Sequence, residues 1–114
     1  MRDKPTRFYS SKQEKSVAKL VGGKQQANSG ASTWQKGDVV NDRFLIECKT
    51  HTKEQKQTTI QKDWLDKIRE EAFGIRKDYY ALAFDFGPDT DKYFVISERL
   101  FRKLDKMLKE ENEL

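Results

Sequence analysis

The stretch Gly37–Thr50, GDVVNDRFLIECKT, decides the fold that this sequence predicts. Polar and apolar residues alternate on both sides of Asn41-Asp42, a pair typical of turns, so the pattern predicts a β-hairpin. Successive side chains of a strand lie on opposite faces of a sheet. On the second strand, one face therefore carries Leu45, Glu47 and Lys49, and the other carries Phe44, Ile46 and Cys48.

Two carboxylates gather at one end of this hairpin. If Val40 and Arg43 flank the turn, Asp38 lies opposite Leu45 and diagonal to Glu47, about 7–8 Å away by sheet geometry. Carboxylates this close repel one another unless a cation lies between them, and Mg²⁺ prefers oxygen ligands. A metal site is therefore one of two interpretations of the hairpin.

Two neighbouring groups fit such a site. The backbone carbonyl of Cys48 would add a third oxygen, and Lys49 would hold or polarise an attacking water. A second interpretation stays open from the hairpin alone, in which Glu47 and Lys49 form an ordinary ion pair at a solvated strand end.

Length and composition limit the class of protein. A chain of 114 residues with 37% charged and 35% hydrophobic residues forms one domain with one modest core. The net charge of +4 and the pI of about 9.1 permit a polyanionic partner without requiring one. The lone Cys48 cannot form an internal disulfide, no apolar run is long enough for a membrane span, and the basic N-terminus lacks an apolar leader segment. We expect a cytoplasmic protein with no membrane contact.

Residues before the hairpin predict a helix and an edge strand. Residues 1–10 are interpreted as a basic N-terminal arm, and Ser11 with Glu14 matches a capping box that would start the helix. Glu14 shares a helical face with apolar residues, so its carboxylate would point towards the sheet. Gly22-Gly23 would end the helix, and a short edge strand over 24–27 would lead into a polar loop, NSGAST.

Residues after the hairpin predict two more helices and two more strands. An exposed loop with a solvated His51 leads to a second helix, which Thr58 would cap with Gln61 and which would end at Gly74. Its first turn, with Gln61 and Lys62, would favour a phosphate. Buried strand 79–86, turn 87–91, strand 93–96, a last helix capped by Ser97 and an acidic tail over 109–114 would follow. The fold class is therefore α/β or α+β, with helices flanking a mixed central sheet in a single domain, 1–114.

These residues together resemble a known family. Glu14 on a first helix, Ser29-Gly30 in a loop, Asp38, and then Glu47-Cys48-Lys49 are similar to the PD-(D/E)XK nuclease superfamily, and within it to the archaeal-type Holliday junction resolvases, including phage-encoded versions. The likeness covers about residues 8–86, and Gly37 stands where the superfamily name has proline. The resemblance implies a restriction-endonuclease-like αβββαβ core with an extra C-terminal strand and helix, Mg²⁺ or Mn²⁺ as the metal, and a homodimer.

The resemblance also implies roles for individual residues. Glu14, Asp38 and Glu47 would be catalytic metal ligands together with the Cys48 carbonyl, and Lys49 would be the catalytic lysine. Substrate contacts are implied for Ser29, with Ser32 as an alternative, and for Lys62 and Gln61. Neither Trp34, which would pack or stack on a base, nor Trp64 receives a catalytic role.

The expected function is that of a structure-specific DNA endonuclease. It would resolve four-way junctions by paired, symmetric phosphodiester hydrolysis, with no small-molecule cofactor. Two alternatives stay open: a nuclease of the same superfamily that acts on flaps or linear DNA, and a DNA-binding module without catalysis.

Overall fold

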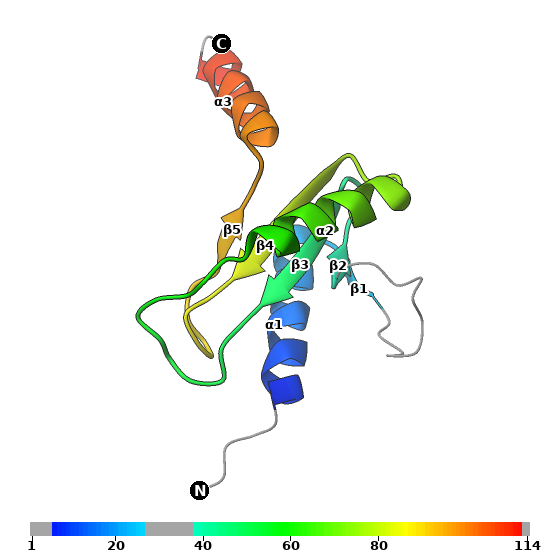
Figure 1. Ribbon diagram of the computed structural model, residues 1–114. Helices are drawn as coiled ribbons and strands as arrows, with labels where there is room; N and C mark the ends of the chain where they lie inside the picture. The colour runs from blue at the N-terminus through cyan, green and yellow to red at the C-terminus, as the bar shows by residue number, and fades with distance from the viewer. Residues whose placement is uncertain (1–5, 27–37, 113–114) are drawn as a thin grey trace, which may run out of the picture.

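The computed structural model describes residues 6–26 and 38–112, and it forms a five-stranded sheet with three helices (Figure 1). The elements in chain order are α1 (Thr6–Val21), β1 (Lys24–Gln25), β2 (Val39–Val40), β3 (Phe44–Lys49), α2 (Lys62–Gly74), β4 (Tyr79–Phe84), β5 (Tyr93–Val95) and α3 (Glu98–Asn112). This order confirms the predicted α+β architecture.

The sheet is mixed, as predicted. Its strands lie in the order β1-β2-β3-β4-β5, and every neighbouring pair is antiparallel except β3 and β4, which are parallel. A parallel pair needs a crossover, and α2 supplies it. In this strand order β3, which carries Glu47 and Lys49, is the central strand of the sheet.

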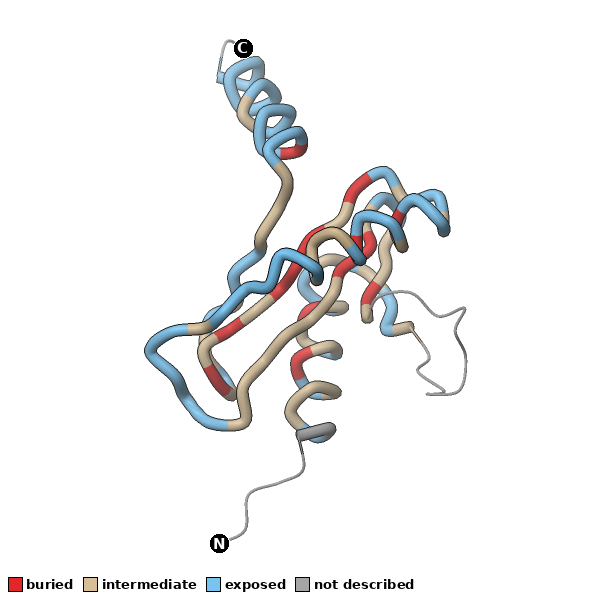
Figure 2. The backbone as a smooth tube through the Cα atoms, viewed as in Figure 1, coloured by how far each residue is buried: buried red, intermediate tan, exposed pale blue. Residues whose placement is uncertain are grey.

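Helices α1 and α2 pack against opposite faces of this sheet, and buried residues follow the central strands (Figure 2). The core on the α1 face contains Val17, Val39, Ile46, Ala81 and Ala83. The core on the α2 face contains Leu45, Ile68 and Ala72. The predicted division of β3 is confirmed, because Ile46 and Leu45 belong to different cores.

The first helix begins earlier than predicted. It starts at Thr6, so residues 6–10 of the expected basic arm are helical and Ser11 lies inside the helix rather than at its start. Ser11 and Glu14 therefore form no capping box. The predicted end is confirmed, since Gly22 adopts a φ of 63° and the Gly23 amide donates to the Ala18 carbonyl at 2.8 Å.

The register of the hairpin also differs from the prediction. Val40 pairs with Leu45 rather than with Arg43. The side-chain oxygen of Asn41 accepts hydrogen bonds from the amides of Arg43 and Phe44 at 3.0 and 2.8 Å, so the turn is longer than a two-residue turn. A tight turn of the favoured type needs positive φ at both central residues, and neither Asn41 nor Asp42 has it.

The other two helices differ in smaller ways. Helix α2 begins at Lys62 with Gln61 as its N-cap residue, so the capping box at Thr58 is wrong. The cap of α3 is confirmed, because the Ser97 hydroxyl accepts from the Leu100 amide at 3.1 Å. Residues 109–112 of the expected acidic tail belong to α3, which projects away from the sheet (Figure 1).

Candidate functional site

Asp38, directly before β2, and Glu47, in β3, lie near the same end of the hairpin. The ladder pairs Val39 with Ile46, and the Asp38 amide donates to the Ile46 carbonyl at 3.0 Å, so Asp38 does not lie opposite Leu45 as predicted. The carboxylate of Asp38 bends towards β3 and accepts a hydrogen bond from the Cys48 amide at 2.7 Å. The two acidic residues are near enough for the charge of Asp38 to act on Glu47.

The electrostatics of this pair follow from burial. Burial, followed by repulsion from Asp38, raises the pKa of Glu47 to about 7. Burial also raises the pKa of Asp38, while the hydrogen bond from Cys48 and the charge of Lys49 lower it. Two carboxylates that are hard to ionise in place form a site that a cation would stabilise.

Glu14, on helix α1, interacts with Asp38 through its charge. Its pKa is raised by burial and then by repulsion from Asp38, while a hydrogen bond with the side chain of Gln25 lowers it. Val17, one turn later on the same face, is fully buried against the sheet, which confirms the predicted direction of this face. In the part of the chain that the structure describes, no three His, Cys, Asp or Glu side chains are arranged to hold a metal ion together. Glu14 as a third ligand therefore stays a prediction.

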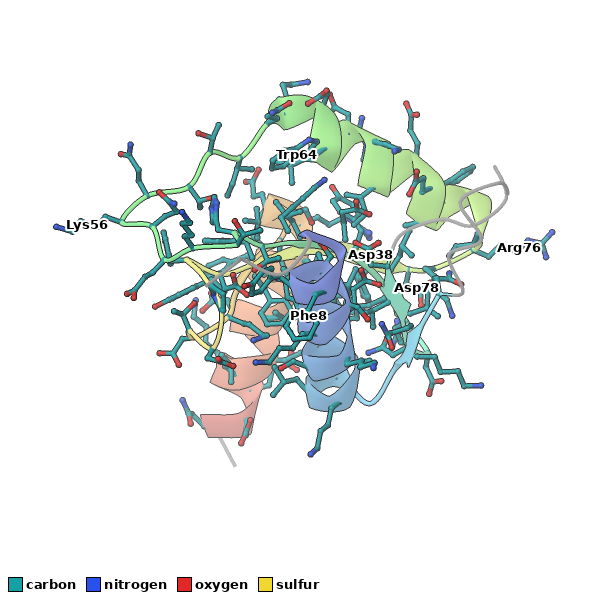
Figure 3. All side chains as sticks on the ribbon, turned by 90° about the horizontal axis from the view of Figure 1, so that it is seen from below. Phe8, Asp38, Lys56, Trp64, Arg76 and Asp78 are labelled. Atoms are coloured by element: carbon teal, nitrogen blue, oxygen red, sulfur yellow. The ribbon has the colours of Figure 1, made fainter. Side chains whose placement is uncertain are left out.

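Lys49 lies between an acid and an aromatic ring. Its Nζ is 3.7 Å from Oε1 of Glu47 and 4.4 Å from the centre of the Trp64 ring. Trp64 extends from the side of α2 that faces the sheet (Figure 3). The cation–π contact and the ion pair together hold the ammonium group over the end of β3.

A hollow of about 280 Å³ opens between β3 and α2 at this point. Its lining residues are Glu47, Lys49, Asp63, Trp64, Lys67, Ile68 and Glu71. The Glu71 side chain is 12% exposed, and its charge raises the pKa values of both Asp38 and Glu47. Lys67, 3.8 Å from Glu71, lowers both. Helix α2 thus lines the side of the hollow opposite β3.

The sequence interpretation missed the residues with which α2 lines this hollow. Trp64, Lys67 and Glu71 follow one another at intervals of three and four residues, which places them on one face of a helix. The same helix was expected to send its apolar residues to the sheet. Combining these two patterns would have placed Lys67 and Glu71 beside the charged end of β3.

The other predicted site residues have mixed outcomes. Gln61 is exposed, and Lys62 pairs with Asp66 at 2.8 Å while its side chain is 87% exposed. His51 is partly buried and shares a hydrogen bond of 2.9 Å with Thr58, so it is less solvated than predicted. Ser29, Ser32 and Trp34 lie outside the described residues.

The oxygen atoms around Asp38 suit a hard divalent cation. The amide and carbonyl of one strand residue point to the same side, so the Cys48 carbonyl faces Asp38 as its amide does. Mg²⁺ is commonly held by one or two carboxylates and keeps several waters. Asp38, Glu47 and the Cys48 carbonyl supply oxygen donors of the type that Mg²⁺ binds.

No described helix is both long enough and apolar enough to cross a membrane. Comparison of the chain with family models, with curated proteins and with solved structures gave no match.

Proposed function

We propose that this protein is a Mg²⁺-dependent DNA endonuclease that hydrolyses phosphodiesters in four-way junctions. The observation that carries the proposal is that two repelling carboxylates, Asp38 and Glu47, and the ammonium of Lys49 lie together at one end of the hairpin. Mn²⁺ would substitute for Mg²⁺, since both prefer oxygen ligands.

Each residue of the site has a distinct role in this proposal. Asp38, Glu47 and the Cys48 carbonyl would hold the cation, with Glu14 adding negative charge near Asp38. The bound cation would supply positive charge where the phosphate gains negative charge during hydrolysis. Lys49 would orient the attacking water and donate a hydrogen bond to it. Trp64 and Glu47 would keep the Lys49 side chain in place.

The junction as substrate and the homodimer belong to the same proposal. A four-way junction has two-fold symmetry, so a two-fold symmetric protein dimer would place one site on each of two opposed strands. Strand β5 and helix α3 present large exposed apolar side chains that suit a dimer interface: Tyr93, Phe94, Phe101, Leu104, Met107 and Leu108. Such an interface would account for a helix that projects from the sheet.

The test is a cleavage assay on an immobile four-way junction, a flap and a linear duplex, each with and without Mg²⁺. The wild-type protein is expected to nick the junction at paired, symmetric positions when Mg²⁺ is present and not when it is absent. Asp38→Asn should lose cleavage by at least about 100-fold and keep its DNA affinity, because the basic contacts remain. Asp42→Asn, a change of the same kind in the exposed turn of the same hairpin, is the matched control and should cut as wild type does.

The outcomes separate the alternatives. Cleavage of flaps or linear DNA without junction cleavage would contradict the proposed substrate but support the proposed nuclease activity. DNA binding without cleavage by wild type in Mg²⁺ or Mn²⁺ would leave a binding module with structural acids. Full activity of Asp38→Asn would remove Asp38 from the site.

A further inference from the structure

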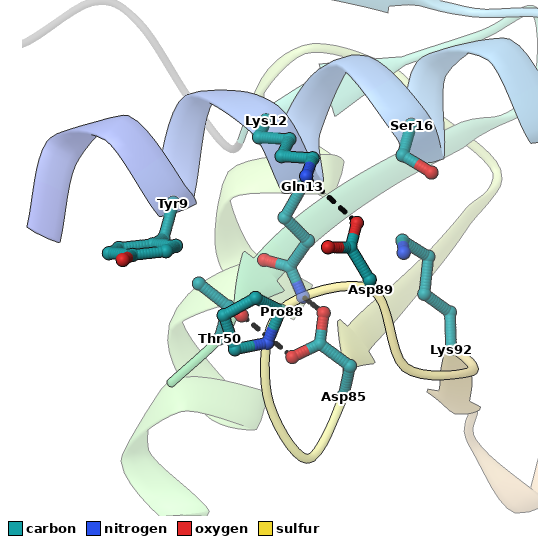
Figure 4. A pocket seen from close by; sticks show the side chains of 9 residues that line it. All are labelled: Tyr9, Lys12, Gln13, Ser16, Thr50, Asp85, Pro88, Asp89 and Lys92. Carbon is teal, nitrogen blue, oxygen red and sulfur yellow. Dashed lines mark hydrogen bonds and ion pairs between the residues drawn. The ribbon is translucent and has the colours of Figure 1, made fainter. Parts of the chain in front are cut away.

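A buried polar cluster lies on the α1 face of the sheet, on the far side from Trp64. Gln13 is 4% exposed and Asp85 is 3% exposed, and within the described residues they are the two buried polar side chains. Figure 4 shows them meeting beneath α1, beside a cavity of about 60 Å³. Burial of a charged carboxylate costs free energy unless donors surround it, so this cluster needs a reason.

Both amide hydrogens of Gln13 have acceptors. Its Nε2 donates to the backbone carbonyl of Lys49 at 2.6 Å and to Oδ2 of Asp85 at 3.0 Å. The two bonds fix the orientation of the side-chain amide, since a flipped amide would turn its oxygen towards two acceptors. Gln13 therefore links helix α1 to the last residue of β3.

Asp85 is held from its other side. Its Oδ1 accepts hydrogen bonds from the Thr50 hydroxyl at 2.6 Å and from the Gly87 amide at 3.2 Å. Thr50 directly follows Lys49 in the chain. The cluster thus holds the backbone carbonyl of Lys49 and the side chain of Thr50, while the side chain of Lys49 extends to the opposite face of the sheet.

We propose that Gln13 and Asp85 are positioning residues that fix the backbone of Lys49 and thereby the direction of its ammonium group. This inference rests on the proposed function for its effect on cleavage, but the geometric part is independent of it. A displacement of about 1 Å at a reacting group can cost about 100-fold in rate, so a hydrogen bond to the backbone carbonyl of Lys49 itself matters.

Gln13→Met is the informative variant, because methionine has a similar length and removes both donors. We expect kcat on the junction to fall by about 10- to 100-fold with the dissociation constant for DNA unchanged. Lys12→Met, on the same helix turn, removes an exposed ion pair with Asp89 and is the matched control. It should keep the wild-type kcat.

A double-mutant cycle tests whether Gln13 acts through Lys49. In a Lys49→Ala background, Gln13→Met should reduce the residual cleavage by less than about twofold, because the group that it positions is gone. An equal loss in both backgrounds would show a general structural role and overturn the proposal.

An activity-free measurement separates this inference from the proposed function. The Trp64 ring, 4.4 Å from Nζ of Lys49, should shift the resonances of the adjacent methylene group upfield in the NMR spectrum. Gln13→Met should move those resonances towards free-lysine values, even if the protein cut no DNA at all. Unchanged Lys49 resonances in a folded Gln13→Met protein would overturn the proposal.

If Gln13→Met does not fold, Thr50→Val replaces it in both measurements, because it keeps Gln13 and removes one donor to Asp85. It should shift the Lys49 resonances in the same direction by a smaller amount. Wild-type resonances and wild-type kcat in that variant would equally count against the proposal.

Discussion

The carboxylate of Asp38 accepts a hydrogen bond from the backbone amide of Cys48 at 2.7 Å, across the end of the hairpin. Asp38 therefore stabilises the strand through this bond and destabilises it through repulsion of Glu47. The two effects can be separated by substitution, because asparagine keeps an oxygen acceptor and loses the charge.

We expect Asp38→Asn to be at least as stable as the metal-free wild type at pH 8 and Asp38→Ala to be less stable than Asp38→Asn. Loss of the acceptor for the partly buried Cys48 amide should cost about 1–3 kcal/mol. Urea denaturation without divalent cations measures both variants. Equal free energies of unfolding for the two would show that the Cys48 hydrogen bond contributes nothing.

The stability of the metal-free protein should fall as the pH rises from 5 to 8. The folded-state pKa of Glu47, about 7, lies above the usual 4.5, so the folded protein binds the proton more tightly than the unfolded chain. The stabilisation is complete below about pH 4.5 and is lost as the pH passes 7, by on the order of 3 kcal/mol. Thermal denaturation across this range checks it.

Glu47→Gln is the control for this pH dependence, since it carries no titrating group and should flatten the slope. The raised pKa values of Asp38 and Glu14 would leave a smaller decline in the same direction. Millimolar Mg²⁺ should restore wild-type stability at pH 8 and leave Glu47→Gln little changed. Stability that increases from pH 5 to 8 would contradict the burial of these carboxylates.

Trp64 should matter for cleavage through its ring. Trp64→Leu removes the cation–π contact with Lys49, which is worth about 0.5–2 kcal/mol, so single-turnover cleavage should slow by about 2- to 30-fold. Trp64→Phe keeps an aromatic face and should recover most of the rate. If leucine and phenylalanine gave equal rates, the ring would serve packing alone.

Gly23 should tolerate no side chain. A Cβ at this position would clash with the carbonyl oxygen of Val40 on the neighbouring strand, so Gly23→Ala should destabilise the protein by about 1–3 kcal/mol. Gly74, where a Cβ would meet nothing within 4 Å, is the matched control at the end of α2. Gly74→Ala should be neutral or slightly stabilising, and similar losses for both variants in thermal denaturation would contradict the contact.

The sequence predicted the element order and the faces of β3 because both follow from hydrophobic period. It failed at the starts of α1 and α2, where capping-box patterns describe local hydrogen bonding that the chain does not use. Helix α1 already begins at Thr6, directly after Pro5 in the sequence, and Gln61 keeps an extended backbone with a ψ of 136°. The packing of whole helices, rather than the local capping motifs, determines where α1 and α2 begin.

The candidate site was partly predictable for a related reason. Asp38, Glu47 and Lys49 are close in sequence and share a hairpin, so alternation alone brought them near one another. Gln13, Asp85 and Glu71 come from distant segments, and their contacts with β3 depend on how two helices and a parallel strand pack. No local pattern encodes that arrangement, and the hairpin register depended on one Asn41 side chain.

Cys48 gives this molecule a built-in reporter. Burial raises the pKa of its thiol, so the native protein presents almost no thiolate to an alkylating reagent. It is the one cysteine of the chain, and it lies between Glu47 and Lys49. The rate of its covalent labelling therefore records how often this strand opens, and a bound cation or DNA should lengthen the labelling time without any probe being added.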